Sequence, residues 1–382
     1  MASQRICDAM LPDLSRVFQV GMTETAQVIW AFAVVYGLAQ LFYGPLGDRI
    51  DKFSIITFAT LGCSIGSLAA AFSGSLDALV LARMAVALCA AAVIPLSLAW
   101  IGDAVPYEQR LETLAKVGLG TTLGNVGGQL MGGLLTDTLG WRWAFALLTL
   151  CFAAVGALLY ADLLRQQKAS AEHIPEASAA AERPAFLAQA WLILTEPWSR
   201  YVLLIALAEG ASGFSVMAII ATHLHQELGL SLSLAGAIVA LFGLGGVLYM
   251  MLARHLIQRL GEIGLARVGG TLMGLSFLVL GFASWWPLTP LACLSAGFGF
   301  FMFHNTMQAN ATQMAPTARG TAVSMFASCL FLGQAVGVLL AAHLIALVGS
   351  GAVIALGGGG VMALGLLLAR GLRRRSRVTP AA

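Results

Sequence analysis

Charged residues are scarce in this sequence, and their scarcity excludes an ordinary soluble domain. Asp, Glu, Lys and Arg make up 10% of the 382 residues, hydrophobic residues make up 59%, and the mean hydropathy is +0.86. A soluble domain carries about 25% charged residues because water wets its whole surface. The chain is therefore expected to lie mostly in lipid. Its net charge of +3 comes from clustered basic loops and gives no reason to expect a nucleic-acid partner.

Patterns that carry catalysis or hold cofactors are missing as well. The six cysteines lie in apolar runs without metal or redox spacing, so we expect them to be buried packing residues. His223 and His225 are two positions apart and would not converge on a metal from one helix. The run Gly357–Gly360 has no lysine after it and predicts close helix packing, not a phosphate-binding loop. We therefore expect no enzyme activity, no cofactor and no metal.

Long apolar stretches dominate the chain and predict an all-α membrane protein. Each is about 20 residues long, enough to cross a hydrocarbon core of about 30 Å. The eleven complete spans that we predict are 25–46, 54–73, 76–101, 114–135, 141–161, 201–222, 232–253, 265–284, 288–313, 320–348 and 351–369. Residues 1–20 form only part of a span, because Arg5, Asp8, Asp13 and Arg16 interrupt them.

A polar segment divides the spans into two groups. Residues 162–198 are rich in Ala, Ser, Glu, Gln and Pro, which predicts a water-exposed linker with an amphipathic helix over 186–194. We therefore predict helix bundles at 1–161 and 199–370, with a basic tail at 371–382.

The polar stretch 44–53 separates the first two complete spans. Gly44, Pro45 and Gly47 are suited to end a helix, because glycine tolerates positive φ and proline cannot continue a helical ladder. The charged residues of the stretch are Asp48, Arg49, Asp51 and Lys52. Any protein with several spans needs charged turns. The pattern Gly-x-Leu-x-Asp-Arg-x-x-Lys, however, resembles the signature loop of the major facilitator superfamily of transporters, which usually has glycine in place of Asp51.

Basic residues indicate on which side of the membrane each loop lies. Seventeen arginines and lysines fall on the side of the signature loop and three on the opposite side, whereas Arg83 lies inside a span. This bias predicts that the signature loop, the linker and the carboxyl terminus are cytoplasmic. The membrane that we expect is the bacterial inner membrane.

The chain also contains an internal repeat. The segment 110–128 is similar to the segment 319–337, which begins 209 positions later (319 − 110). In both, glycines stand 14 and 18 positions after an arginine, and an amide side chain, Asn125 or Gln334, follows the first glycine. The signature loop has a degraded copy at 258–259, at an offset of 210. Two matches at nearly one offset predict two homologous halves.

The repeat also predicts where the first helix begins. The partner of the span 201–222 would lie at about −8 to 13 (201 − 209 and 222 − 209), so we expect the first helix to begin before Met1. Either the start codon is assigned too late or the chain is a truncated form, because half a helix would leave backbone groups unpaired in lipid.

The resemblance to the major facilitator superfamily covers the whole chain and implies a fold of twelve helices in two six-helix halves, with the first helix truncated. Arg83 in the fourth span and the glycine spacing of the fifth resemble the proton-coupled antiporter branch, which exports drugs and metabolites by alternating access. Those glycines are Gly124, Gly128, Gly132 and Gly133. With Gly44, Asp48, Arg49 and Lys52 they form the conformational motifs that the resemblance implies.

One departure from the family pattern leaves the direction of transport open. Gln129 replaces the proline that kinks the fifth helix of typical exporters. Proton-coupled efflux of a small organic molecule is the first interpretation, and proton-coupled uptake of a metabolite is the alternative. A membrane sensor that does not transport is less favoured, because the chain has no added soluble domain to relay a signal.

Ionisable residues deep in a bilayer are costly, so each is a functional candidate. Glu209 is the one carboxylate well inside a complete span, and we predict that it carries the coupled proton; a structural hydrogen bond is the alternative. Asp8 is the second proton-coupling candidate, and we expect it to pair with Arg5, three positions before it. Arg83 could hold a counter-charge, bind substrate or tune an acid.

Polar residues in the spans are further charge-partner or substrate candidates. They are His304, Asn305 and Gln308 in the tenth span, with Asn125 and Gln334. Hydrogen bonding between helices is the plainer explanation for the residues of the tenth span. The partners that we expect are a small-molecule substrate, protons and the lipid bilayer, and the chain is expected to be a monomer.

Overall fold

The computed structural model describes residues 1–47, 49–171, 186–315 and 318–378, and every regular element in them is a helix. In chain order these are α1 (Ala2–Arg5), α2 (Leu11–Phe18), α3 (Met22–Thr25), α4 (Gln27–Gly47), α5 (Lys52–Ala71), α6 (Leu76–Ala104), α7 (Tyr107–Thr138), α8 (Trp141–Ala171), α9 (Phe186–Thr195), α10 (Pro197–Glu209), a π-helix (Gly210–Phe214), α11 (Ser215–Leu228), α12 (Leu232–Phe282), a short 3₁₀ turn (Trp286–Leu288), α13 (Thr289–Gln313), α14 (Arg319–Val348) and α15 (Ser350–Val378).

The helices confirm the predicted spans. Nine helical segments in the described part of the chain are long and apolar enough to cross a membrane. One of them, α12, contains two spans, because the backbone at Gly261 has φ +59° and breaks the helix there. The less apolar α7 is 32 residues long and supplies the eleventh. The predicted linker helix is also present as α9.

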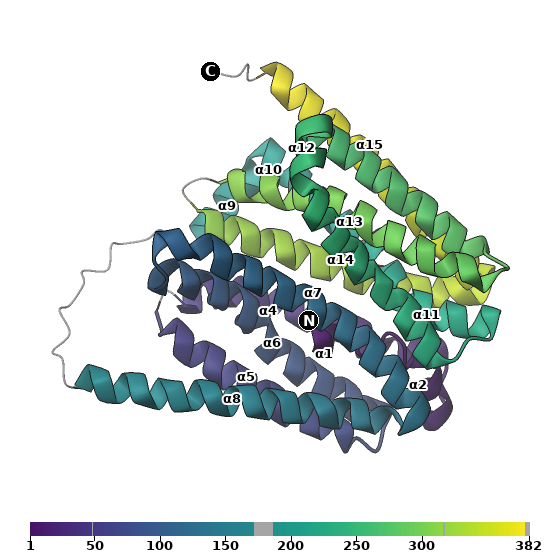
Figure 1. The fold of residues 1–382 in the computed structure, drawn as a ribbon, viewed down its shortest axis with the longest axis horizontal. Coiled ribbons are helices and arrows are strands. Elements are labelled where there is room, and N and C mark those ends of the chain that lie inside the picture. The colour runs from purple at the N-terminus through teal and green to yellow at the C-terminus, as the bar shows by residue number, and fades with distance from the viewer. Residues whose placement is uncertain (48, 172–185, 316–317, 379–382) are drawn as a thin grey trace.

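The two halves of the molecule meet along two helix pairs. In Figure 1, α4 to α8 occupy the lower part, α10 and α12 to α15 lie above them with α11 at the right, and α7 and α14 lie at the boundary. The two most extensive contacts across it are α7 with α12 and α4 with α14. Small residues make the approach close: the Ser328 hydroxyl donates to the Gly37 carbonyl at 2.6 Å, and a Cβ on Gly236 would lie 2.7 Å from the Gln129 carbonyl oxygen.

The internal repeat appears in the structure as two equivalent helix contacts. A Cβ on Gly128 would lie 2.5 Å from the Ala2 carbonyl oxygen, and a Cβ on Gly337 would lie 2.2 Å from the Ala211 carbonyl oxygen. Both the glycines and the alanines are 209 positions apart (337 − 128 and 211 − 2). The same backbone contact therefore joins the first helix to the fifth in each half.

A polar contact joins the halves at the end opposite the signature loop. Asp137, at the end of α7, accepts hydrogen bonds from the Ser233 backbone N–H at 2.5 Å and from its hydroxyl at 2.6 Å. Ser233 lies in the first turn of α12, and Ser231 caps that helix by accepting a hydrogen bond from the Leu234 N–H at 3.2 Å. A side chain of the amino-terminal half thus completes the first turn of α12 in the carboxyl-terminal half.

The cysteines only partly follow the prediction that they are buried. Cys7, Cys63 and Cys293 are buried, whereas Cys151 is exposed on α8. The prediction is wrong for Cys151, because α8 turns a broad apolar face outward, where Leu150 is also exposed. A span in lipid can expose apolar residues that a soluble protein would bury.

Candidate functional site

Glu209 lies at the end of α10, where the helix changes its winding. The residue is fully buried, and the π-helix Gly210–Phe214 follows it directly. A Cβ on Gly210 would lie 1.9 Å from the Leu330 carbonyl oxygen, so only glycine fits against α14 at this position. π-Helical turns inside α-helices are frequent at functional sites, because they re-aim the side chains beside them.

His304 is the hydrogen-bond partner of Glu209. Its Nδ1 lies 3.1 Å from Oε2 and 3.3 Å from Oε1 of the carboxyl group. An imidazole N–H can donate to the carboxylate, and a protonated carboxyl group can donate to the neutral ring. The pair can therefore hold one proton in either of two arrangements.

Aromatic rings surround this acid–histidine pair. The His304 ring stacks on Phe300 with 4.8 Å between ring centroids and a 16° interplanar angle. Phe326 lies 5.7 Å and Phe214 lies 6.3 Å from the same ring. These rings exclude water from most of the site, and a low dielectric makes a charge there costly unless it is compensated.

The other polar candidates on α13 do not join the pair. Gln308 is exposed, and Asn305 lies beside Tyr249. Sequence reasoning did not connect His304 with Glu209, because 95 positions separate them. Only the packing of α13 against α10 brings the two together.

Asp8 forms the predicted ion pair with Arg5, and the structure adds a third partner. Arg5 Nη1 lies 3.3 Å from Asp8 Oδ2, and Gln129 Nε2 donates to the same oxygen at 2.8 Å. Asp8 is fully buried, and its other oxygen, Oδ1, has no partner among the described residues. Gln129, which stands where the family has proline, thus binds a proton-coupling candidate instead of kinking α7.

Arg83 anchors the first residues of the chain to α4. Its Nε donates to the Val28 carbonyl at 3.3 Å, and its Nη1 donates to the carbonyl and the hydroxyl of Ser3. The guanidinium lies over the Phe32 ring at 4.2 Å. Backbone carbonyls and an aromatic face thus hold this cation, and no contact in the described part of the chain tests the predicted roles of Arg83 in holding a counter-charge, binding substrate or tuning an acid.

The two amide residues of the repeat and the glycines of the fifth span lie where helices contact each other. The Gln334 side chain accepts from Gln4 across the two halves at 3.4 Å, whereas the Asn125 oxygen is buried without a partner in the described part of the chain. A Cβ on Gly132 would lie 2.2 Å from the Ile6 carbonyl oxygen, and one on Gly133 would lie 2.2 Å from that of Leu232. Gly124 faces Met1. The predicted glycine motif therefore packs against both the first residues and α12.

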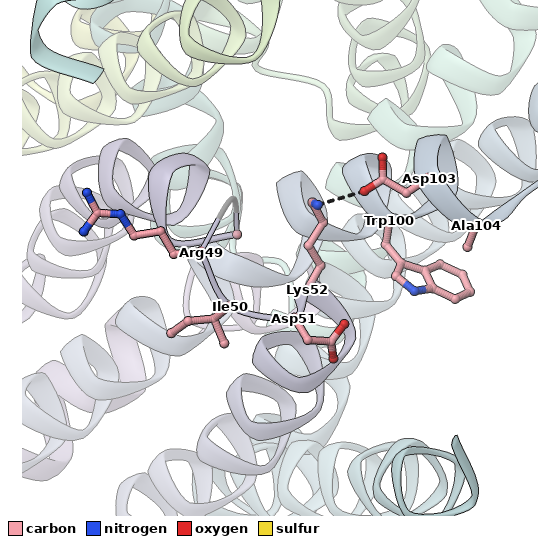
Figure 2. A pocket seen from close by; sticks show the side chains of 8 residues that line it. Arg49, Ile50, Asp51, Lys52, Trp100, Asp103 and Ala104 are labelled. Carbon is pink, nitrogen blue, oxygen red and sulfur yellow. Dashed lines mark hydrogen bonds and ion pairs between the residues drawn. The ribbon is translucent and has the colours of Figure 1, made fainter. Parts of the chain in front are cut away.

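The signature loop contributes a polar hollow of about 440 Å³. Asp48 lies outside the described residues. Lys52 Nζ pairs with Asp103 on α6 at 2.8 Å, and Asp51 caps α5 by accepting from the Ser54 N–H at 2.7 Å. Figure 2 shows Arg49 directed away from the Lys52–Asp103 pair. A Cβ on Gly44 would lie 3.8 Å from the Ser324 hydroxyl oxygen of α14. The signature loop therefore begins beside the carboxyl-terminal half.

Comparisons with known proteins agree on one family. A sequence profile of the Major Facilitator Superfamily matches residues 1–337 and, in an overlapping match, 202–382. The uncharacterized MFS-type transporter YceJ of Bacillus subtilis (strain 168) is 24% identical over 344 residues, 88% of this chain and 83% of YceJ. The putative multidrug resistance protein MdtD of Shigella boydii serotype 4 (strain Sb227) is 26% identical over 302 residues, 78% of this chain but only 58% of MdtD. Three further relatives match over 29% to 35% of their own length.

Solved structures agree on the fold. A bacterial homologue of the human lysosomal transporter Spinster, in an inward-facing and unoccupied conformation, has a TM-score of 0.70 at 17% identity. The match covers 100% of this chain and 96% of that one. The chain is a multi-pass membrane protein with the twelve-helix transporter fold, and it belongs to the Major Facilitator Superfamily.

Proposed function

We propose that this transporter exports a small organic molecule across the bacterial inner membrane in exchange for protons, with Glu209 as the proton carrier. The observation that carries the proposal is the buried Glu209–His304 pair at 3.1 Å, enclosed by aromatic rings. The charged form of a carboxyl group in such a place is costly, and binding of a proton removes that cost. The similarity to a putative multidrug resistance protein supports efflux of a small molecule.

The proposed cycle follows from the charge of the site. A proton taken up on Glu209 from the outer side makes the site neutral, which lowers the cost of closing the two halves around it. Release of that proton to the cytoplasm restores the carboxylate, and His304 then donates to it. In this proposal the substrate binds only when Glu209 has released its proton, so the two cargoes move in opposite directions.

We also propose the orientation and the division of the chain. With the signature loop, the linker and the carboxyl terminus in the cytoplasm, the Asp137–Ser233 contact lies on the outer side. That contact supports an inward-facing arrangement. The bundles 1–161 and 199–370 are proposed to be the rocking units, and the transporter is proposed to work as a monomer.

Uptake of a metabolite together with protons is the second candidate function. It is favoured by Gln129, because this side chain binds Asp8 at 2.8 Å in place of the proline expected in an exporter. The two functions predict opposite signs of proton movement when substrate is added to energised vesicles.

The test uses inverted membrane vesicles that contain the full chain, a pH-sensitive dye and a panel of small organic compounds. An exported compound should release protons from acid-loaded vesicles, and Glu209→Gln should abolish this coupling while leaving exchange of the compound largely intact. Glu227→Gln is the matched control, because Glu227 is the same residue type, exposed at the far end of the same span. Proton-driven accumulation in well-inserted Glu209→Gln protein would disprove the proposal and make Asp8 the next candidate.

A further inference from the structure

The linker helix α9 has an apolar face that no other described part of the chain covers. Its ten residues pack on the molecule through Ile193, which is 3% exposed, and through Gln189, which accepts a hydrogen bond from the Thr321 hydroxyl at 2.6 Å. The opposite face carries large apolar side chains: Leu187, Trp191, Leu192 and Leu194 are 78%, 68%, 67% and 44% exposed. A helix that is apolar on both faces is poorly suited to water.

The length and the place of α9 fit the edge of a bilayer and not a span. Ten helical residues are about 15 Å long, about half of a hydrocarbon core of about 30 Å. Thr321 lies in the first turn of α14, so α9 lies beside the end of the molecule where α10 and α14 begin (Figure 1). In the proposed orientation this is the cytoplasmic end. An apolar helix face at that depth meets the boundary between lipid headgroups and acyl chains.

Arginines gather at the same end, on the last turns of α15. The exposed ones are Arg370, Arg373, Arg374 and Arg375, and none forms an ion pair with a described residue. The Arg375 guanidinium lies over the Trp198 ring at 4.8 Å, three positions after α9 ends (198 − 195). Glu196 lies close to Arg375, but its carboxylate caps α10 by accepting from the Ser199 N–H. Most of the positive charge at this end therefore has no counter-charge in the described part of the chain.

We propose that α9 and the end of α15 form a binding surface for anionic phospholipids of the cytoplasmic leaflet. This inference goes beyond the transport cycle and uses only the proposed orientation. The outer face of α9 lies against the acyl chains nearest the headgroups, with Trp191 at the level where indole rings are favoured. The arginines bind the lipid phosphates, because a guanidinium fits a phosphate with two parallel hydrogen bonds. The contact between Arg375 and Trp198 holds the two parts of the surface together.

Charge complementarity favours lipid over a second copy of the chain as the occupant. A twofold dimer through this face would use the same surface on both copies and would bring two groups of arginines together. Like charges repel, and the apolar contact would have to overcome that repulsion. Anionic lipids in the cytoplasmic leaflet supply both an apolar partner for α9 and a negative partner for the arginines.

The test is a fluorescence titration of the purified full chain in phosphatidylcholine nanodiscs. One series contains increasing amounts of brominated phosphatidylglycerol, and the other contains brominated phosphatidylcholine. Bromine quenches tryptophan fluorescence, and the part of the quenching that is lost in Trp191→Phe reports lipid at α9. The amount that gives half of this quenching should be at least about fivefold lower for phosphatidylglycerol, because each arginine near an anionic surface contributes about fivefold.

A second tryptophan provides the control for general contact with lipid. Trp285 is 63% exposed and lies at the opposite end of the molecule, after α12. The part of the quenching that is lost in Trp285→Phe should not distinguish the two lipids. High salt should also reduce the preference at Trp191, because about 1 M salt screens charges beyond about 3 Å.

Arginine variants decide whether the preference comes from the end of α15. Arg373→Gln combined with Arg374→Gln should remove most of it, whereas Arg373→Lys combined with Arg374→Lys keeps the charge and should retain most of it. The charge-matched control is Arg254→Gln combined with Arg259→Gln, because these exposed arginines lie on α12 shortly before its break. This control should leave the preference unchanged.

Three outcomes would overturn the inference. Equal quenching at α9 by the two lipids would leave only an ordinary lipid contact, and an equal loss of preference in the α12 control would assign it to net charge alone. Quenching at α9 by neither lipid would mean that a protein surface, such as a second copy, covers the helix. The titration requires neither transport nor a proton on Glu209, so these failures are distinct from failure of the vesicle experiment.

Discussion

Asp8 and Glu209 are both fully buried acids, but the two halves of the molecule hold them in opposite ways. Asp8 has a cation and an amide on a single oxygen, so its charged form is compensated. Glu209 has one titratable partner, His304, and aromatic rings around it. Partners that stabilise a carboxylate offset the cost of burying its charge, and a site with fewer such partners leaves that cost in place. The difference supports our proposal that Glu209, and not Asp8, is the proton carrier.

The largest effect is expected where the helices that carry the two acids touch their neighbours. Gly128→Leu and Gly337→Leu would push a side chain into the Ala2 and Ala211 carbonyls, where even a Cβ has less than 3 Å. Overpacking typically costs about 1–3 kcal/mol and more when only backbone could move aside. We expect the yield of folded, monodisperse protein to fall more than about tenfold, as measured by fluorescence-detected size-exclusion chromatography.

The neighbouring glycine gives the control for that experiment. A Cβ on Gly127 would meet nothing within 4 Å, so Gly127→Leu should fold nearly as the natural chain does. If Gly128→Leu and Gly127→Leu expressed equally well, the close contact between the first helix and α7 would be wrong.

Removing one uncharged hydrogen-bond partner, His304 of Glu209 or Gln129 of Asp8, should have a moderate effect that differs between the halves. A hydrogen bond to a charged group is worth about 1.5–3 kcal/mol, so His304→Ala and Gln129→Ala should both lower the melting temperature. Only His304→Ala should change the pH dependence of transport, because Asp8 keeps Arg5. The exposed His343 supplies a histidine control. An unchanged pH profile in His304→Ala would remove the distinction between the two acids.

Shortening the carboxyl side chain should have a smaller effect than removing its charge. Glu209→Asp withdraws the group by one methylene from His304 and keeps its acidity. We expect several-fold slower proton-driven transport with a displaced pH optimum, measured in the same vesicles. Activity as low as in Glu209→Gln would mean that geometry, and not the proton, is what the residue supplies.

The smallest effect on stability is expected at the signature loop. In the Lys52–Asp103 pair the Asp103 side chain is 65% exposed and the Lys52 side chain 23%, and ion pairs near the surface contribute about 0–1 kcal/mol. A double-mutant cycle with Lys52→Ala and Asp103→Ala should give a coupling below about 1 kcal/mol in thermal unfolding. We also propose that the loop biases one access state. Asp48→Asn should then alter turnover, and unchanged transport in correctly inserted protein would contradict this role.

Sequence reasoning found the spans, because hydrocarbon thickness fixes their length, and it found the repeat, because the Gly128 and Gly337 contacts tolerate no side chain. The Arg5–Asp8 pair was also predictable, since three positions on a helix bring two side chains together. The spans, the repeat and this ion pair could all be predicted because each depends on the spacing of residues along the sequence.

Contacts between distant spans were beyond this reasoning. His304 faces Glu209 and Gln129 faces Asp8 only because α13 and α7 pack beside the helices that bear the acids. For the Gln129–Asp8 contact the sequence contains one signal, a polar residue at a position where the family has proline. In the sequence alone this replacement indicates only the loss of a proline kink in the fifth span. Because buried polar side chains are nearly always hydrogen-bonded, a glutamine expected inside a span predicts a polar partner on a neighbouring helix.

The Asp137–Ser233 contact links access to water with helix integrity. Asp137 of one half completes the first turn of α12 in the other, so separating the halves at this end leaves the Ser233 N–H without its acceptor. Only water can replace that oxygen as the gap forms. Asp137 is already exposed, so water is at hand as soon as the helices separate, and the first turn of α12 then keeps its Ser231 cap while water accepts from the Ser233 N–H.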